Sequence, residues 1–413
     1  MGPTTQMGHN LFSFYIVSVF SGLIPLLCAA ASSDEYLPFS YDPSDEYGPG
    51  SWHEIAMDRS DPSTFGPIWG KYVGWQHVNL KITGNACASD RRPSPVDLVA
   101  KNECGADHEI LTHAPTDEDC GFGDLLFVPT PHALVAKFPY NDVRCRRPQI
   151  DLPDGWPNWW TAALMEFHVR SEHTIDGRRY DGEMIMYHHG TFSHKRELAA
   201  VSVLLDASGD EIDLRFQAYL EAFGEAVERV RSNCDAGVEY VDPDPNWLDD
   251  FQKMSDIYTK ENQQRRGRGL GEDDGRGLDV REARLQVDAR LLEEQLRRTA
   301  DTAAGRKSTP RPRPFPYDIW PTIYWYRYGG GLTQPPCTEM VLWTVLDSPL
   351  VISRGQFRTL AALIDSYIDP KTCQRMDATV KGENVRPLGK FNAAEQNITH
   401  CTAKNYGNFR YKD

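Results

Sequence analysis

The sequence lacks an excess of positive charge. Its 413 residues contain 44 lysines and arginines against 59 aspartates and glutamates, which gives a net charge of -15 at pH 7. An acidic chain repels nucleic acid and anionic membranes, so the composition excludes proteins that bind these partners through a basic surface. With 40% hydrophobic residues, the chain can still build a sizeable core.

Long hydrophobic runs are also missing, with one exception. Residues 11–31, "LFSFYIVSVFSGLIPLLCAAA", are apolar and uncharged and end in small residues before the polar "SSDEY". This pattern predicts a signal peptide, residues 1–31, cleaved near Ala31. The run is nearly long enough to span a bilayer and no Lys or Arg precedes it, so a retained membrane anchor is the alternative. Either way the remainder enters the secretory pathway, to be secreted, held at a membrane or routed to an organelle.

No two cysteines have the spacing of a zinc knuckle, so a cysteine metal cluster is not expected. Cys28 would leave with the signal peptide, and the eight remaining cysteines form an even set that predicts disulfides in an oxidising compartment. Asn397 begins "NIT", a sequon for N-linked glycosylation.

Aromatic residues are absent between Tyr258 and Phe315, and the chain has no internal repeat. This stretch contains "QQRRGRGLGEDDGRG" and then a charged segment with a thin Leu/Val stripe, which predicts a loop followed by a helix that is either solvated or docked on a partner. We therefore expect a polar insertion at about 240–312 in a domain of residues 32–390, followed by a C-terminal tail, 391–413.

The rest of the domain has the pattern of short strands. Alternating or apolar runs such as "ALVAKF", "LMEFHV", "GEMIMYHH" and "AAVSVLL" are separated by turn residues between about 96 and 205, and strand-like sequence resumes with "TIYWYRY" and "MVLWTVL". Phe216, Leu220, Phe223 and Val227 are spaced as one face of a helix. The pattern predicts a mainly β domain of the α+β class.

Several blocks occur in the order of a known family. "EYGPGSW" (46–52), "RPSPVDL" (92–98), "PHALVAKF" (131–138), "EFHVRSEHTIDGRRYDGEMIMYHH" (166–189), "YGGGLTQPPCTEMVLWTVL" (328–346) and "NVRP" resemble successive signatures of the α-class carbonic anhydrases. The resemblance implies a twisted, mostly antiparallel sheet of about ten strands with a few peripheral helices. It also implies a Zn²⁺ held by three histidines on two neighbouring strands, whose bound hydroxide attacks CO₂.

The ligand strands depart from the family pattern. One alignment keeps His168 as the first ligand and puts Arg170 at the second position, and an alignment without a gap puts Glu166 and His168 at the first two. Both place Ile185 at the third. An aliphatic side chain cannot donate to Zn²⁺ and an arginine stays protonated, so we expect a degenerate site with His168 as its one family-matched ligand. Substitute ligands, if the site is rearranged, are Glu166, Glu183 and a bulged His189.

Other family positions are kept. By resemblance, Thr333 would orient the zinc hydroxide, Glu172 would accept the proton of that threonine, His132 is at the proton-shuttle position, and Tyr41 matches a cleft tyrosine. Gln334 replaces the family's second threonine, and Tyr187 should crowd the CO₂ pocket. The resemblance also implies a disulfide between Cys87 and Cys337. We expect His173 to be a buried hydrogen-bonding residue, and His188 and His189 to be packing or surface residues rather than ligands, because His188 and Ile185 point to opposite faces of a regular strand.

Two functions stay open. The first is a non-catalytic, carbonic-anhydrase-related binding or structural module with no cofactor, in which Arg170 replaces the charge of the metal by pairing with Glu172 or Glu183. Its partner is an unknown protein or small molecule, bound through the 240–312 insertion. The alternative is a zinc hydratase with rearranged ligands that acts on CO₂ and bicarbonate. An esterase finds little support, because no Ser-His-Asp signature occurs.

Overall fold

The computed structural model describes residues 39–55, 85–105, 108–112, 119–139, 145–152, 159–190, 198–238, 315–376 and 378–409. All of them belong to one compact unit, Glu35–Asp413. The predicted signal peptide and the predicted insertion lie outside the described residues. Among the helices that are described, none is long and apolar enough to cross a membrane.

The fold is mostly β. A twisted sheet of 12 strands has the main order β2-β15-β12-β13-β11-β10-β7-β5-β4, with β14 beside β11, β6 beside β7 and β3 beside β6. Most pairings are antiparallel, whereas β11 pairs in parallel with β13 and β14, and β15 with β2. The bounds are β2 Asn102–Glu103, β3 Leu111–Thr112, β4 Leu126–Pro129, β5 Leu134–Lys137, β6 Gln149–Asp151, β7 Trp159–Val169, β10 Gly182–Gly190, β11 Leu198–Gly209, β12 Trp325–Gly330, β13 Val341–Leu346, β14 Leu350–Ser353 and β15 Thr399–Cys401.

Smaller elements surround this sheet. A second sheet of three short strands contains β1 (Asp97–Leu98), β8 (Thr174–Ile175) and β9 (Arg178–Arg179). The helices are α2 (Leu214–Asp235), α5 (Arg354–Asp365) and α6 (Ala403–Phe409), with 3-10 turns at Trp52–Glu54, Phe122–Asp124 and Pro316–Ile319. The predicted fold class is therefore confirmed. The segment assigned to a tail adds β15 to the main sheet, which continues past residue 390.

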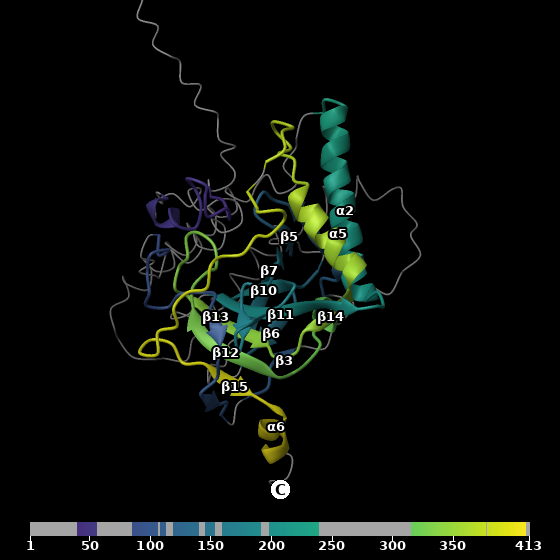
Figure 1. The fold of residues 1–413 in the computed structure, drawn as a ribbon. Helices are drawn as coiled ribbons and strands as arrows, with labels where there is room; N and C mark the ends of the chain where they lie inside the picture. Colours follow the sequence, from purple (N-terminus) through teal and green to yellow (C-terminus); the bar gives the residue numbers. More distant parts are fainter. Residues whose placement is uncertain are drawn as a thin grey trace, which may run out of the picture. The chain divides into compact units, whose positions relative to one another are not determined.

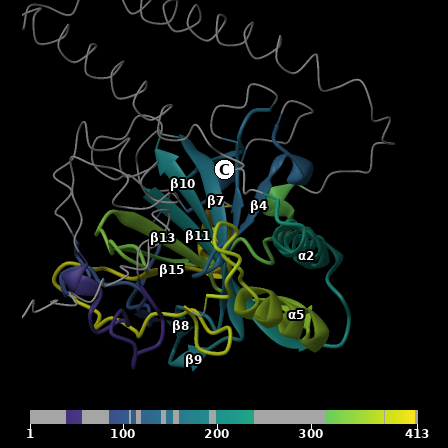
Figure 2. The same cartoon turned by 90° about the horizontal axis from the view of Figure 1, so that it is seen from above.

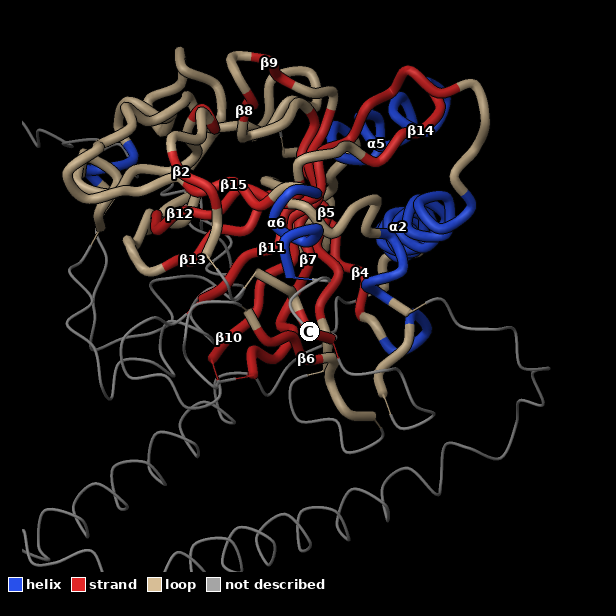
Figure 3. Tube along the Cα trace, turned by 90° about the horizontal axis from the view of Figure 1, so that it is seen from below, coloured by secondary structure: helices blue, strands red, loops and turns tan. Residues whose placement is uncertain are grey.

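Helix α2 shows how the sequence specifies its place. Asp213 begins the helix, since its side chain accepts hydrogen bonds from the backbone N–H groups of Arg215 and Phe216. The predicted apolar face is buried, and Phe216 and Phe223 contact Phe167 of β7. Figures 1 and 2 show α2 and α5 on one side of the strands, and Figure 3 shows the same layers from below.

The two faces of β7 and β10 pack into different cores. Met165 and Phe167 belong to the larger core on the helix side, with Met184 and Met186 of β10. Leu164, Ile185 and Tyr187 belong to a second core on the other face. The alternation follows from the strand period of two, and it directs Glu166 and His168 into the second layer. Buried charged groups there require partners, since each would otherwise lose its hydration without compensation.

Candidate functional site

The register between β7 and β10 sets the centre of the site. Glu166 lies opposite Ile185, and His168 lies opposite Glu183, in an antiparallel pairing that is regular up to a bulge between Tyr187 and His188. The side chains of Glu166, His168, Glu183 and Ile185 are fully buried, with exposures of 0%. Glu166, His168 and Ile185 thus share one buried layer, which is the grouping that the alignment without a gap expects.

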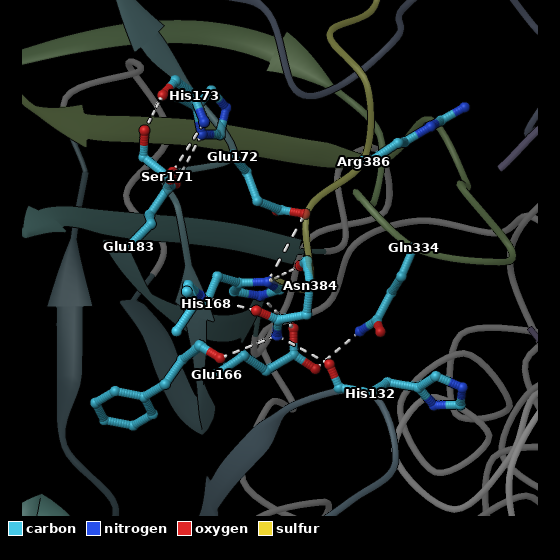
Figure 4. Close-up of polar contacts among 12 residues, drawn as sticks. His132, Glu166, His168, Ser171, Glu172, His173, Glu183, Gln334, Asn384 and Arg386 are labelled. Atoms are coloured by element: carbon cyan, nitrogen blue, oxygen red, sulfur yellow. Dashed lines mark hydrogen bonds and ion pairs between the residues drawn. The ribbon is translucent and has the colours of Figure 1, made fainter. Parts of the chain in front are cut away.

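His168 lies between two carboxylates. Its Nδ1 donates to the backbone oxygen of Asn384 at 2.8 Å and lies 3.8 Å from Oε1 of Glu172, while its Nε2 lies 3.8 Å from Oε2 of Glu166. Figure 4 shows the imidazole enclosed by these groups. Burial would lower the pKa of His168, but Glu172, Glu166 and the Asn384 carbonyl outweigh it and raise this pKa to about 9. At neutral pH His168 is thus a buried cation between two acids.

Gln334 holds the other end of Glu166. Its Nε2 donates to Oε1 of Glu166 at 2.8 Å, across from the side that faces His168. The family's second threonine would be too short to play this role. Gln334 and Glu166 therefore depend on each other: the Gln334 amide donates to a buried carboxylate oxygen that would otherwise lack a donor.

Glu172 and Thr333 remain together, as the resemblance implies. Both are fully buried, although the Thr333 hydroxyl and the two Glu172 oxygens have no hydrogen-bond partner among the described residues. Burial is the larger effect on Glu172 and raises its pKa, while His168 pulls it down. Arg386 is a further positive charge that interacts with Glu172. Its guanidinium donates hydrogen bonds to the carbonyl oxygens of Ser94 and Cys87.

Glu183 belongs to a separate buried network. Its Oε1 accepts from Nδ1 of His173 at 2.7 Å and from the Ser202 hydroxyl at 2.6 Å, and its Oε2 accepts from the backbone N–H of His173 at 2.9 Å. Tyr328 completes the chain, with its hydroxyl 2.7 Å from Nε2 of His173. The expectation that His173 is a buried hydrogen-bonding residue is confirmed. Glu183 is fully committed to this network, so it is not free to bind a metal.

Arg170 does not enter the site, which corrects the proposed charge replacement. Its side chain is 53% exposed and pairs with Glu383 at 3.3 Å, rather than with Glu172 or Glu183. The backbone explains this: Arg170 follows the end of β7 and has φ 59, so the alternation of strand faces no longer applies to it. The buried cation that faces both carboxylates is His168 instead.

The histidines at the end of β10 are buried. His188 is 0% exposed and its Nε2 lies 3.0 Å from the Tyr317 hydroxyl, and His189 is 7% exposed. Both therefore pack inside rather than at the surface. His189 lies opposite Thr161 of β7, seven residues along that strand from His168, a span of roughly 20 Å at the strand rise. The bulge does not bring His189 to His168.

Tyr41 and His132, which the resemblance places in the cleft, lie in an aromatic cluster with Phe39 and Trp52. Tyr41 and Trp52 lie edge to face at 5.5 Å, and His132 stacks on Phe39 at 3.6 Å and donates from Nε2 to its carbonyl oxygen at 2.7 Å. Burial lowers the pKa of His132 to about 4, which does not suit a shuttle near neutral pH. A disulfide joins Cys87 to Cys337 beside this cluster, the pair that the resemblance implies. The other pairs are Cys104–Cys401, Cys120–Cys145 and Cys234–Cys373.

Zinc, the metal that the resemblance implies, does not fit these residues. The two glutamates face opposite edges of the His168 ring, so only Nε2 of His168 and Oε2 of Glu166 converge on one point. Ile185 occupies the third position, and a tetrahedral site needs three protein donors plus water. Among the described residues, no three His, Cys, Asp or Glu side chains are arranged to hold a metal ion.

Asn384 is a residue that the sequence reading missed. It is fully buried and fixes His168 through its backbone oxygen, while its side chain accepts from the backbone N–H of Val169 and donates to the backbone oxygens of His132 and Phe167. The family block "NVRP" contains this asparagine, but the resemblance implies no role for it. Its partners lie more than 200 residues away in the sequence, so nothing local indicated them.

Comparison with known proteins identifies the class. The model of the eukaryotic-type carbonic anhydrase family matches residues 294–395, which include β12, β13, Thr333 and Asn384. The chain therefore carries an α-class carbonic anhydrase domain, and the resemblance drawn from its motifs is confirmed. Glu166, His168 and Ile185 lie outside the matched range.

The relatives are carbonic anhydrases and a nacrein-like protein. The chain is 41% identical over 73 residues to a nacrein-like protein of Mytilus californianus and 39% identical over 71 residues to carbonic anhydrase 12 of Homo sapiens. These matches cover 16% and 17% of this chain and 23% and 19% of the relatives. A match to alpha carbonic anhydrase 7 of Arabidopsis thaliana is 21% identical and covers 92% of this chain and 93% of the relative.

Solved structures give matches at low identity. The α-carbonic anhydrase of Thermovibrio ammonificans with sulfanilamide has a TM-score of 0.44 at 16% identity and covers 87% of this chain and 98% of its own. Dioscorin complexed with ascorbate has a TM-score of 0.46 at 15% identity, with 88% of this chain and 97% of its own covered.

The buried histidines predict a stability maximum close to pH 6.5. Burial lowers the pKa of His132 to about 4 and that of His188 to about 3, so the unfolded chain binds more protons than the folded one as the pH falls below the ordinary value of 6.5. Over this range, each of these two histidines lowers the free energy of unfolding by up to about 1.4 kcal/mol per pH unit. The pKa of His168 is raised, so its contribution is present below pH 6.5 and is lost as the pH rises towards 9.

Urea unfolding at intervals from pH 4 to pH 9 measures this profile. The free energy of unfolding should fall on both sides of the maximum, more steeply on the acid side. His53, which is 47% exposed, provides the control, because His53→Gln should leave the profile unchanged. A profile that is flat between pH 5 and pH 6.5 would contradict the burial of neutral His132 and His188.

Proposed function

We propose that this chain is a carbonic-anhydrase-related protein that binds no catalytic zinc and acts as a binding or structural module rather than as a hydratase. The observation that carries the proposal is Ile185, which is fully buried and lies directly opposite Glu166 at the third family position. One imidazole and one carboxylate oxygen remain at the centre, fewer than the donors that the hydration of CO₂ requires.

Internal charge balance supports the same proposal. In a zinc enzyme the metal offsets the negative charge of nearby carboxylates, whereas here Glu166 and Glu172 flank the imidazole of His168 at 3.8 Å. Gln334 and Asn384 satisfy further polar atoms of the same group. The charge of His168 thus offsets part of the negative charge of Glu166 and Glu172, although Nε2 of His168, Oε2 of Glu166 and both oxygens of Glu172 have no hydrogen-bond partner among the described residues.

Two of the three substitute ligands of the rearranged hydratase, Glu183 and His189, are badly placed for it. Glu183 is bound by His173 and Ser202, and His189 lies far along β10. The proposed module would act in the secretory pathway, which the disulfides support. Its partner would be a protein or small molecule other than nucleic acid, and the 240–312 insertion is the proposed place of contact.

Thermal unfolding in the presence of zinc or a chelator tests the proposal. A ligand that binds the folded state stabilises it by about 2.7 kcal/mol at a concentration of 100 Kd, which raises the melting temperature by several degrees. We expect the same melting temperature with added Zn²⁺, with EDTA and with neither. A fall in EDTA that zinc reverses would show a resident metal, and an active α-carbonic anhydrase provides the positive control.

A further inference from the structure

Asn397 lies in an exposed position between a turn at residues 393–395 and β15. The side chain of Asn397 faces solvent, the next residue, Ile398, is buried at 3% exposure, and Thr399 begins the strand. The three residues form the sequon "NIT", whose chemistry requires an asparagine amide followed two positions later by a hydroxyl. The alternation fixes the asparagine outside and the isoleucine inside.

The amide group of Asn397 is accessible for modification. Its Oδ1 accepts a hydrogen bond at 2.8 Å from Nδ2 of Asn102, and both partners are exposed. Among the described residues, no hydrogen bond from Nδ2 of Asn397 itself is found. The nitrogen that would carry a sugar is therefore not needed to hold the turn.

The disulfides supply the second observation. Cys104 and Cys401 are joined: Cys401 is the last residue of β15, which begins two residues after Asn397, and Cys104 directly follows β2, the strand of Asn102. Four such bonds fit a chain that folds in an oxidising compartment, where N-linked glycosylation also takes place. We propose that Asn397 carries an N-linked glycan that covers the β2 edge of the main sheet.

The modification is a glycosyl transfer. A bond forms between Nδ2 of Asn397 and the anomeric carbon of an oligosaccharide, and the bond from that carbon to the pyrophosphate of a lipid-linked donor breaks. The pyrophosphate leaves with the bonding electrons, and the amide nitrogen loses one proton. The side-chain amide keeps its carbonyl oxygen, so the hydrogen bond from Asn102 can remain.

The glycan has a physical role at this position. In the strand order of the described residues, β2 is an outer strand of the main sheet, and both of its residues are exposed. An outer strand offers unpaired backbone groups to other chains and needs protection. Asn102 of β2 contacts Asn397 directly, so a sugar on Asn397 projects beside this edge. The salt bridge from Lys404 to Glu103 at 2.8 Å adds a charged pair on the same strand.

The test uses the full chain secreted from a eukaryotic host. Digestion with an amidase that releases N-glycans should lower the mass of the wild-type protein in one step and convert Asn397 to aspartate. Thr399→Ala should remove that step, while Thr399→Ser, which keeps the hydroxyl, should retain it. A wild-type mass that does not change on digestion, with the chain secreted and folded, overturns the glycosylation.

The role at the edge is measured on the same variants. Asn397→Gln and Thr399→Ala should self-associate more than the wild type and Thr399→Ser when they are concentrated, as seen by light scattering. Equal association of all four proteins would overturn the protective role while leaving the modification in place. Neither result depends on zinc or activity, so the outcome is independent of the proposed function.

Discussion

Glu166→His combined with Ile185→His should produce a protein that binds one zinc ion per chain. The two positions face each other across β7 and β10, and His168 lies two residues from Glu166 on the same face. Three imidazoles would then point into one buried space, which is the donor set of a catalytic zinc site. Metal analysis after dialysis against zinc and then against buffer measures the result.

The surroundings favour metal uptake in this variant. Nδ1 of His168 already donates to the Asn384 carbonyl, which orients the ring and leaves Nε2 as the ligand nitrogen. Removal of Glu166 also removes one of the carboxylates that raise the pKa of His168, so the neutral imidazole becomes easier to form. Tyr187, fully buried in the same layer, should keep the hydration rate below that of a natural enzyme.

A matched variant separates the two alignments. Arg170→His with Ile185→His also adds two histidines, but position 170 is exposed and pairs with Glu383. We expect no stoichiometric zinc in that protein. If it binds zinc and the Glu166 variant does not, the register of β7 against β10 is wrong.

Glu183→Ala should destabilise the protein by about 3–5 kcal/mol, because it leaves a buried histidine without its acid. His173 and Ser202 both donate to this carboxylate, which is 0% exposed. Burial opposes its ionisation, but His173 and the hydrogen bonds from His173 and Ser202 outweigh this and lower its pKa to about 2. Urea unfolding with the disulfides intact measures the loss of free energy.

Glu383→Ala provides the control. The Glu383 side chain is 42% exposed and pairs with Arg170 at the surface, where an ion pair contributes about 1 kcal/mol at most. The loss of unfolding free energy in Glu183→Gln should lie between the losses in Glu183→Ala and Glu383→Ala, since an amide keeps one acceptor oxygen but loses the charge. A loss of less than 1 kcal/mol for Glu183→Ala would show that the network does not hold the sheet together.

The strands could be predicted because their sequence pattern is local. The runs "LMEFHV" and "GEMIMYHH" lie within β7 and β10, and Phe216 and Phe223 are buried on the predicted face of α2. The place of Arg170 could not be predicted in this way. One alignment with the family put it at the ligand position next to His168, but the chain leaves the strand after Val169 and turns with a positive φ, so tertiary context decided its direction.

The sequence predicted which residues lie at the centre of the site, but it did not predict the hydrogen bonds that these residues make. Glu166, His168 and Ile185 were named from the resemblance, and the structure brings them together. The contacts from Asn384 and Gln334 join the ligand strands to loops more than 150 residues away, and hydrogen bonds at such separation leave no periodic signal. The choice between the two alignments likewise needed the β7–β10 register.

The zinc content and the CO₂ hydration rate of one purified sample of the unmodified chain test the central claim most directly. With Ile185 opposite Glu166 and with His168 flanked by two carboxylates, we predict less than one-tenth of a zinc ion per chain, as an order-of-magnitude bound for a site with too few donors, and a rate equal to that of buffer. One zinc ion per chain together with hydration that a chelator abolishes would contradict the proposal.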